Sequence, residues 1–336
     1  MNRQELQRLF EHFKTMKVLI IGDVMVDSYI FGKVDRISPE APVPVVNVQR
    51  KESRLGGAAN VARNIKALGA MPVLAGCIGN DRDGEELLRI LSAEGLSTEG
   101  IMKLNRPTTV KSRIIGNHHQ LLRIDEESEA DLDALETELV QKTILQLLET
   151  GNFKAVIFED YDKGLISESL IKTVVEYCNK NEIVVTADPK KRNFLAYNGV
   201  DLFKPNLKEI REGLKILVDP SSDESLKLAD NQLRFSLNHR YSLITLSEHG
   251  LVYSNGQEFA RIPAEEIHIA DVSGAGDTVI SIATLCLAAG IDMKSAAQIS
   301  NLAGASVCER VGVVPVDATE LFDKALIALT DSTNSE

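Results

Sequence analysis

Cysteine and tryptophan are scarce in this sequence of 336 residues, which has four cysteines and no tryptophan. Cys77, Cys178, Cys286 and Cys308 lie far apart and form no CxxC pair. That spacing argues against a disulfide framework or a zinc site and favours reduced thiols. Long hydrophobic runs are absent as well: no segment reaches the roughly 18 apolar residues of a membrane span, and the N-terminus has no signal-peptide core. We therefore expect a cytoplasmic protein that does not enter a membrane.

Positive charge is limited too. Lys and Arg number 37 against 49 Asp and Glu, which gives a formal net charge of −12 and a pI near 5.1. A protein that binds nucleic acid through a broad basic face needs the opposite balance. We expect no nucleic-acid partner, and any phosphorylated ligand must be held by a few local cations.

Several catalytic motifs are missing. The P-loop pattern GxxxxGK[ST] does not occur, and the GAGDTV segment lacks the third glycine of a dinucleotide-binding fingerprint. The nucleophile elbow GxSxG is also absent. The six histidines show no metal-ligand spacing, and the adjacent His118 and His119 would point to opposite faces of a strand. We expect these two to be surface or lid residues, and the missing motifs argue against a P-loop ATPase, an NAD enzyme and a serine hydrolase.

Strands and helices alternate along most of the chain. Apolar runs rich in β-branched residues, such as VLIIG at 18–22, predict parallel strands covered on both faces. Further strands are predicted at 72–78, 155–158, 183–187, 201–204 and 242–246, and helices at 83–94, 132–150, 167–179, about 207–217 and 223–237. This rhythm is typical of a doubly wound, mostly parallel α/β sheet. With 44% hydrophobic residues, the chain can bury the core of one large domain or of two smaller ones.

Two segments interrupt the rhythm. The first, at about 28–54, contains Pro39, Pro42 and Pro44, which suit edge strands and rigid connections. The second alternates over 108–124 and predicts a hairpin that turns at Gly116 and Asn117. Together they could form a small sheet over the mouth of an active site. The alternative is two ordinary edge hairpins.

The segment 269–289, IADVSGAGDTVISIATLCLAA, has the strongest chemical signal. A small-residue turn of Gly274, Ala275 and Gly276 opens an apolar helix, so unpaired backbone N–H groups and the helix dipole can hold an anion there. Asp277 sets a carboxylate beside that anion site. Phosphoryl transfer needs this pair, because the turn stabilises charge on a phosphate while the carboxylate accepts the proton of the attacking hydroxyl.

Polar residues near the N-terminal strand predict the part of the active site that binds a sugar. Asp23 and Asp27 are predicted just past the carboxyl end of that strand, where open α/β sheets bind ligands. Gly57 opens a helix, and Asn60 in its first turn can both donate to and accept from a sugar hydroxyl. Alternatively, the aspartates are turn residues and Asn60 satisfies local backbone groups at the helix start.

The segment NLKEI predicts the part of the active site that binds a metal ion. Asn206 and Glu209 are three residues apart, hence on one helical face, and suit hydrated Mg²⁺ held through water. The same two residues also fit a capping box, with Asn206 as N-cap and Glu209 at the third helical position. The two interpretations are compatible.

Two of these segments together carry a family resemblance. LGGAANVA at 55–62 and DVSGAGDT at 271–278, in this order, resemble the two signatures of the ribokinase-like (PfkB) carbohydrate kinases. The resemblance implies one ribokinase-like α/β domain at 1–330, a mostly parallel sheet flanked by helices. It also implies a small β-sheet lid built from inserted segments at about 28–54 and 106–125. Residues 331–336 are expected to be a disordered tail.

The resemblance also implies the chemistry. It implies a kinase that uses ATP and Mg²⁺, with room for a monovalent cation, and a homodimer formed through the lid. Asp277 would be the base and Gly274, Ala275 and Gly276 the anion hole. The other implied site residues are Asp27, Gly56, Gly57 and Asn60 near the sugar, Asn206 and Glu209 near Mg²⁺, and Asn206, Ser247, Gly250, Asp271 and Asn301 near the nucleotide.

Three further segments narrow the choice of substrate. GDVMVDSYIFGKVDRISPEAPVPVV, EDYDKG and ADPK are similar to the family members that phosphorylate D-glycero-D-manno-heptose 7-phosphate at O1, on the route to ADP-heptose and lipopolysaccharide core. No HxGH motif of a nucleotidyltransferase occurs, so we expect a separate adenylyltransferase in the same pathway. The alternatives are a kinase for another sugar, sugar phosphate or nucleoside, and a non-catalytic sugar or nucleotide sensor.

The phosphate on such a substrate needs cations. The expected binding residues are Lys163 and Lys190, because each directly follows a predicted strand. Further candidates are Arg54, Arg123, Lys191 and Arg192. The alternative for each is an ordinary exposed surface cation.

Overall fold

A nine-stranded sheet forms the body of the protein in the computed structural model, which describes residues 1–117 and 119–331. Its strands are β1 (Lys17–Gly22), β4 (Met71–Gly79), β5 (Gly100–Leu104), β8 (Ala155–Glu159), β9 (Val184–Asp188), β10 (Leu202–Phe203), β11 (Tyr241–Thr245), β12 (Leu251–Ser254) and β13 (Phe259–Ile262). Their order is β13-β12-β11-β10-β9-β8-β1-β4-β5. The pairs from β5 to β11 are parallel, whereas β12 and β13 run antiparallel at one edge. The predicted doubly wound, mostly parallel sheet is thus confirmed.

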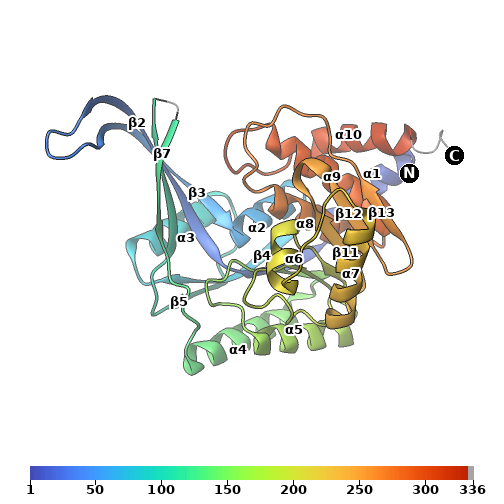
Figure 1. The fold of residues 1–336 in the computed structure, drawn as a ribbon. Coiled ribbons are helices and arrows are strands. Elements are labelled where there is room, and N and C mark those ends of the chain that lie inside the picture. The colour runs from blue at the N-terminus through green and yellow to red at the C-terminus, as the bar shows by residue number, and fades with distance from the viewer. Residues whose placement is uncertain (118, 332–336) are drawn as a thin grey trace.

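Helices cover both faces of this sheet (Figure 1). One layer contains α1 (Arg3–Phe13), α2 (Ala58–Ala67), α3 (Arg82–Ala93), α8 (Ala275–Ala288), α9 (Met293–Cys308) and α10 (Ala318–Asp331). The other contains α4 (Ala134–Gly151), α5 (Glu168–Lys180), α6 (Leu207–Leu214) and α7 (Asp223–Leu237). Among the described residues, no helix combines the length and the apolar character needed to cross a membrane.

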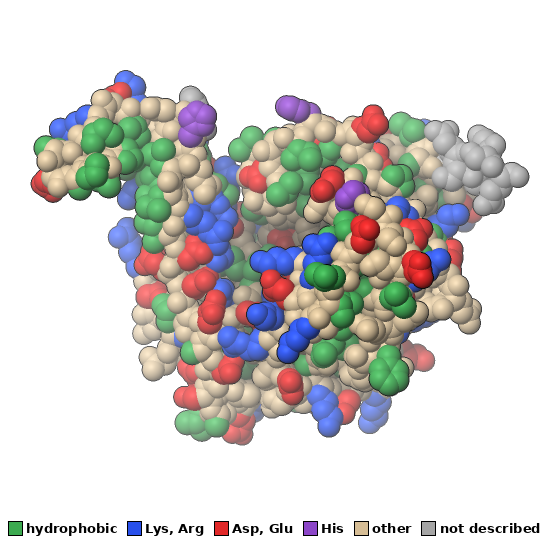
Figure 2. Space-filling model, in the orientation of Figure 1, with side chains coloured by type: hydrophobic (Ala, Val, Ile, Leu, Met, Phe, Trp, Pro, Cys, Tyr) green, Lys and Arg blue, Asp and Glu red, His purple; other side chains and the backbone are tan. Residues whose placement is uncertain are grey.

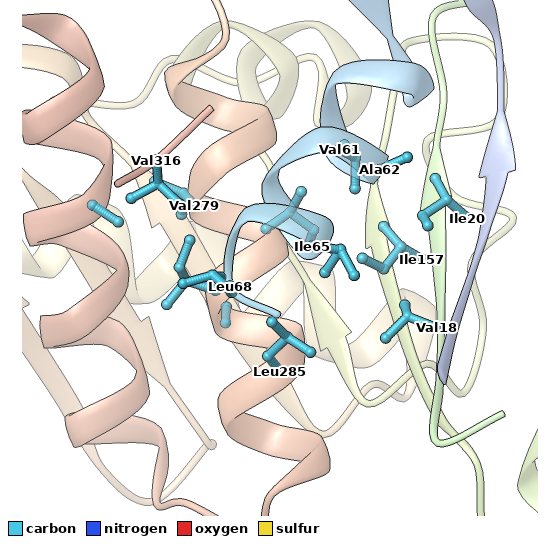
Figure 3. Close-up of a cluster of buried hydrophobic side chains, with 14 of the residues drawn as sticks. Val18, Ile20, Val61, Ala62, Ile65, Leu68, Ile157, Val279, Leu285 and Val316 are labelled. Carbon is cyan, nitrogen blue, oxygen red and sulfur yellow. The ribbon is translucent and has the colours of Figure 1, made fainter. Parts of the chain in front are cut away.

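The central strand β1 shows why its sequence forms a buried parallel strand. Val18 and Ile20 pack into the core on the α2 and α8 side, while Leu19 and Ile21 pack into the core on the α4 and α5 side. Alternate side chains of a strand point to opposite faces, so an uninterrupted apolar run fills both cores. Figure 3 shows the first core, in which the side chains of the strands meet α2 and α8.

The helix α8 lies in the middle of that core. Every residue from 277 to 286 is buried, and α8 packs against both α2 and α9. A helix that is apolar all round must be enclosed by its neighbours. The expected buried helix after the GAG turn is therefore present, and its N-terminus is fixed in position by the packing.

A second, four-stranded sheet projects from the body (Figure 1). Its strands are β2 (Val24–Ile37), β3 (Pro44–Gly57), β6 (Thr109–Gly116) and β7 (His119–Glu126), in the order β3-β2-β6-β7. The β2–β6 pair is parallel and the other two pairs are antiparallel. Both inserted segments thus join in one sheet, and Pro44 begins an edge strand, where proline is tolerated.

The structure corrects one placement. Asp27 does not lie in a turn after β1; it lies inside β2, opposite Arg54 of β3. The chain continues as a strand because β2 pairs with β3 along most of its length and with β6 from Met25 to Gly32. Asp23 does lie directly after β1, as predicted. The predicted turn at Gly116 and Asn117 separates β6 from β7, with Asn117 at φ 50°; His118 and the tail residues 332–336 lie outside the described residues.

Candidate active site

The polar residues of the candidate site come from the carboxyl ends of neighbouring parallel strands. Asp23 follows β1, Glu159 ends β8, Asp188 ends β9 and Lys204 follows β10. Asp277 meets them from the first turn of α8. The carboxyl ends of parallel strands lie along one edge of a sheet, so residues far apart in sequence come together there.

Asp277 is buried, with 6% of its surface exposed, and both of its carboxylate oxygens accept a hydrogen bond. The Asn60 amide donates to Oδ2 at 2.7 Å, and the Tyr161 hydroxyl donates to Oδ1 at 3.0 Å. Burial raises the pKa of Asp277, and Asp188 raises it further, while the two donors act in the opposite direction. A fixed carboxylate with a raised pKa is suited to accept a proton.

The GAG turn keeps the space in front of Asp277 open. Gly274 is the N-cap of α8 with φ 82°, and no side chain caps the helix. The first-turn N–H groups therefore have no side-chain acceptor, which leaves them available for an anion. A Cβ at Gly274 would lie 2.8 Å from the Asn60 Nδ2 atom, and one at Gly276 would lie 3.5 Å from the Lys204 Nζ atom.

Glu159, Asp188 and Asp277 form a buried acidic cluster whose carboxylate oxygens lie within 4.8 Å of one another. Glu159 Oε2 is buried without a hydrogen-bond partner among the described residues. Burial and the charges of Asp188 and Asp277 raise the pKa of Glu159 well above its ordinary value. The buried Lys204 donates to Asp188 at 2.7 Å and supplies the nearest countercharge.

Asn206 and Glu209 form a capping box, which was one of the two interpretations of these residues in the sequence. Asn206 Oδ1 accepts from the Glu209 N–H at 2.9 Å, and Glu209 Oε2 accepts from the Asn206 N–H at 2.8 Å. The Lys190 ammonium donates to the other Glu209 oxygen. Burial and the Asp188 charge raise the pKa of Glu209. The predicted metal role of Asn206 and Glu209 stays a prediction.

The predicted sugar residues lie where the second sheet joins the body. Asp27 is 4% exposed and pairs with Arg113 of β6. Gly56 packs directly on the Asp27 carboxylate, and Gly57 has φ 60° at the start of α2. A side chain at either glycine would collide with a neighbour. Asn60 lies in the next turn and bonds Asp277, not local backbone as the alternative held.

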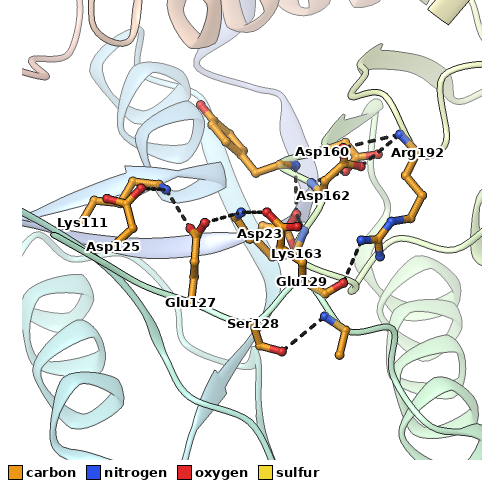
Figure 4. A network of polar contacts seen from close by, with 12 residues as sticks. Asp23, Lys111, Asp125, Glu127, Ser128, Glu129, Asp160, Asp162, Lys163 and Arg192 are labelled. Atoms are coloured by element: carbon orange, nitrogen blue, oxygen red, sulfur yellow. Dashed lines mark hydrogen bonds and ion pairs between the residues drawn. The ribbon is translucent and has the colours of Figure 1, made fainter. Parts of the chain in front are cut away.

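Lys163 and Lys190, the cations predicted first for a substrate phosphate, are already paired. Lys163 Nζ donates to Glu127 at 2.8 Å and to Glu129 at 3.3 Å (Figure 4). Lys190 is bonded to Glu209. Neither has a free ammonium in this arrangement. Among the other candidates, Arg123 pairs with Asp125, Arg192 with Asp131 and Arg54 with Glu52, while Lys191 is exposed.

The predicted nucleotide residues shape loops next to the GAG turn. Asp271 accepts from the Ser273 N–H at 2.9 Å and from the Gly312 N–H at 3.0 Å. Asn301 donates to the Pro263 carbonyl at 2.9 Å. Ser247 and Gly250 have φ 54° and 77° around a single 3₁₀ turn after β11. Asp271 and Asn301 hold their loops in shape through these side-chain bonds, whereas Ser247 and Gly250 contribute through their backbone conformations. Contact of these residues with a nucleotide stays a prediction.

Three important residues escaped the sequence analysis: Tyr161, Glu159 and Arg113. Tyr161 and Glu159 belong to EDYDKG, directly after a predicted strand, and that position was the available signal. Their approach to Asp277 is a tertiary contact across more than 100 residues. Arg113 was hidden among the alternating residues of a hairpin.

The surface is hollowed between the second sheet and the body, and Lys and Arg side chains gather along that hollow (Figure 2). The hollow gives a ligand access between the two parts of the molecule. Protein-family and structural comparisons are consistent with this architecture.

Curated relatives match most of the chain. The bifunctional protein HldE of Methylobacillus flagellatus is 39% identical over 305 residues, which are 90% of this chain and 62% of that protein. The bifunctional protein HldE of Campylobacter curvus is 38% identical over 324 residues, or 96% of this chain and 67% of that protein. The chain thus spans about two thirds of the length of these relatives.

Solved structures share the fold at low sequence identity. Phosphofructokinase-2 from Escherichia coli in complex with potassium has a TM-score of 0.78 and 18% identity, covering 94% of this chain and 99% of that one. Arabidopsis thaliana ribokinase complexed with ribose and ATP has a TM-score of 0.69 and 16% identity, covering 91% and 98%. Residues 15–319 match the pfkB family carbohydrate kinases. The chain belongs to the pfkB family of carbohydrate kinases.

Proposed function

We propose that this protein transfers the γ-phosphoryl group of ATP to O1 of D-glycero-D-manno-heptose 7-phosphate, giving the 1,7-bisphosphate used in ADP-heptose and lipopolysaccharide core synthesis. The observation that carries the kinase chemistry is Asp277, held by Asn60 and Tyr161 beside an uncapped helix N-terminus. The choice of heptose rests on the similarity of RISPEAPVPVV, EDYDKG and ADPK to the heptose kinases. The identity of 38–39% to proteins named bifunctional protein HldE supports the assignment of heptose.

The transfer uses residues of known position. The O1 hydroxyl attacks the γ-phosphorus, its proton passes to Asp277, and the bond from the γ-phosphorus to the bridging oxygen breaks, so that ADP leaves. The N–H groups of the GAG turn stabilise charge on the transferred group. Asn60 Oδ1 is buried with no partner among the described residues, so it is ready to accept from a sugar hydroxyl.

The acidic cluster fits a divalent cation beside the phosphates. Mg²⁺ prefers oxygen ligands and neutralises phosphate charge during transfer. Glu159 Oε2 is an unpartnered buried oxygen, and Asp188 lies next to it. Asn206 and Glu209 would act through water, because their own oxygens already form the capping box. Ser247, Gly250, Asp271 and Asn301 would border the nucleotide, and a monovalent cation would be a further cofactor.

We propose a homodimer formed through the second sheet, which would act as a lid. Its outward positions include the exposed apolar side chains Leu122 and Ile124, 53% and 43% exposed. We further propose a cytoplasmic location and an adenylyl transfer to the product at a later step of the pathway.

A substrate panel tests the proposal. ADP release is measured with D-glycero-D-manno-heptose 7-phosphate, other sugar phosphates, unphosphorylated ribose and fructose, and a nucleoside. We expect the highest kcat/KM with the heptose 7-phosphate and phosphate incorporation at O1 by phosphorus NMR. A preference for another substrate would leave the kinase chemistry standing and overturn the heptose assignment. Absence of turnover with every member would favour the non-catalytic sensor.

A further inference from the structure

We propose that Arg54 and Arg113, on the inner face of the second sheet, bind the phosphate group that the sugar substrate already carries. This inference rests on the proposed function, because it concerns a substrate that arrives phosphorylated. It replaces Lys163 and Lys190 as the principal phosphate-binding residues, because the single side-chain nitrogen of each lysine is held by a carboxylate. Each arginine is also paired with a carboxylate, but it has further nitrogens without a partner among the described residues.

Strand pairing puts the two arginines on one face. Arg54 lies opposite Asp27 in the β3–β2 pair, and Arg113 lies opposite Tyr29 in the β2–β6 pair. Asp27 and Tyr29 are two residues apart on β2, so their side chains share a face of the sheet, and their cross-strand partners share it with them. The β2–β3 and β2–β6 strand pairs together therefore bring both guanidinium groups to the same surface.

That face looks toward the GAG turn. A Cβ built at Gly312 would collide with Arg54 and would lie 3.8 Å from the Tyr29 hydroxyl oxygen. Gly312 itself is bonded to Asp271, two residues before Ser273. Burial raises the pKa of Asp271, but the Ser273 and Gly312 hydrogen bonds and, less strongly, the Arg113 charge lower it below its ordinary value. Arg54 thus lies beside Gly312, which is bonded to the segment before the GAG turn, and Arg113 shares the Tyr29 ring with Arg54.

The aromatic ring of Tyr29 contacts both arginines. The Arg54 and Arg113 guanidinium carbons lie 4.7 Å and 5.3 Å from the centroid of the Tyr29 ring. Such contacts hold a guanidinium group in place while leaving its N–H edge free for an anion. Tyr29 is itself buried at 6% exposure, so this platform is rigid.

Each guanidinium group has donors to spare. Arg113 uses Nη1 for Asp27 and for the Lys111 carbonyl, and Arg54 uses Nη2 for Glu52. Their other N–H groups have no hydrogen-bond partner among the described residues. Arginine carries five donors in a planar fork that matches the oxygens of a phosphate. A phosphate can therefore bind without breaking the existing ion pairs.

The test compares D-glycero-D-manno-heptose 7-phosphate with the same heptose lacking the phosphate, using the full chain and ADP release. The variants are Arg54→Gln, Arg113→Gln and Arg113→Lys. Arg50→Gln is the matched control, because Arg50 is on β3 and pairs with the same Glu52 at 2.6 Å, but lies over Phe31, farther from the body.

For the two glutamine variants we expect KM for the phosphorylated heptose to rise about tenfold or more, as for loss of a charge-assisted hydrogen bond, with KM for ATP unchanged. Preference over the unphosphorylated heptose should fall by the same factor. Arg113→Lys, which keeps a charge for Asp27, should fall between wild type and Arg113→Gln, and Arg50→Gln should match wild type.

An equal loss with both sugars, or no loss with either, would overturn the inference. Failure of the heptose assignment gives a different result: the wild-type protein would then prefer another sugar. If that sugar carries a phosphate, the same variants are compared on it and on its unphosphorylated form. If it carries none, the arginine site is overturned while the kinase chemistry of Asp277 stands.

Discussion

Tyr161 donates its hydroxyl to Asp277 Oδ1 at 3.0 Å, although Tyr161 follows the strand β8 and Asp277 lies in the first turn of the helix α8. The loop that carries Tyr161 is itself fixed, because the Tyr161 N–H donates to Asp23 at 2.9 Å. Asn60 holds the other Asp277 oxygen from α2. The proposed base is thus oriented by groups from three separate parts of the chain, which together set its direction and its proton affinity.

Asp277→Asn should lower kcat by about 10²–10⁴-fold, because a positioned general base contributes that much to proton transfer. The asparagine has nearly the same shape, so the fold and ATP binding should persist. Circular dichroism, ATP titration and ADP release check these outcomes. The exposed Asp323→Asn on α10 is the control and should behave like wild type. Near-normal turnover in Asp277→Asn would rule out the assigned base.

Tyr161→Phe should move the acid limb of the kcat/KM profile to higher pH. The Tyr161 hydrogen bond stabilises the ionised form of Asp277 and lowers its pKa, while burial, the largest cause, raises it. Without the hydroxyl the base stays protonated to a higher pH, so activity is lost earlier as the pH falls. A uniform drop at every pH, with the limb unmoved, would mean that Tyr161 only supports the fold.

Gly274→Ala should damage catalysis as well as stability. Gly274 has φ 82°, where a side chain costs about 1–2 kcal/mol, and the new methyl group would press on the Asn60 amide 2.8 Å away. A displaced Asn60 misplaces Asp277, which should cost about 10–100-fold in kcat. Gly290→Ala is the matched control, with φ 77° and nothing within 4 Å of the new Cβ. It should show the stability loss alone in thermal unfolding.

Asp23→Asn should stabilise the protein at neutral and alkaline pH. Burial and Asp160 raise the pKa of Asp23 from 3.8 to about 6, so the folded state binds its proton more tightly than the unfolded state. Ionised Asp23 therefore costs stability above about pH 6, up to roughly 3 kcal/mol for the full shift, and this cost vanishes below pH 3.8. Unfolding in urea at pH 8 and at pH 4 checks this. An asparagine variant less stable than wild type at pH 8 would contradict it.

The sequence was sufficient to predict the parallel sheet because β1, β8 and β9 are apolar on successive residues, which few other structures accommodate. It also predicted both halves of the second sheet, from proline placement and alternation. Strands β5, β12 and β13 were not predicted, because GIMKL, LVYS and FARI are short and have mixed polarity. Strands β5 and β13 lie at the two edges of the sheet and β12 lies next to β13, and such strands are defined by their neighbours more than by their own residues.

In the candidate site, too, the sequence predicted what depends on neighbouring residues and missed what depends on tertiary contacts. The GAG turn and Asp277 are adjacent in sequence, so one local pattern carried both. Asn60, Tyr161 and Glu159 reach Asp277 only through the packing of α2 and β8 around α8, and nothing in their own segments fixes that distance. The pairing of Lys163 with Glu127 and Glu129 is likewise a tertiary contact, which is why an available cation was expected there.

The strand β3 ends at Gly57, and Asn60 lies in the next turn. Only three residues of backbone therefore separate the second sheet from Asn60, which is hydrogen-bonded to the proposed base Asp277. A sugar that contacts Asp27 and Asn60 would touch both the second sheet and a residue that holds Asp277. A water molecule in the place of the sugar hydroxyl touches no part of that sheet. We therefore expect ATP to be hydrolysed only slowly when no sugar is bound, so that the same strand which helps to select the substrate also protects the phosphoryl donor from the solvent.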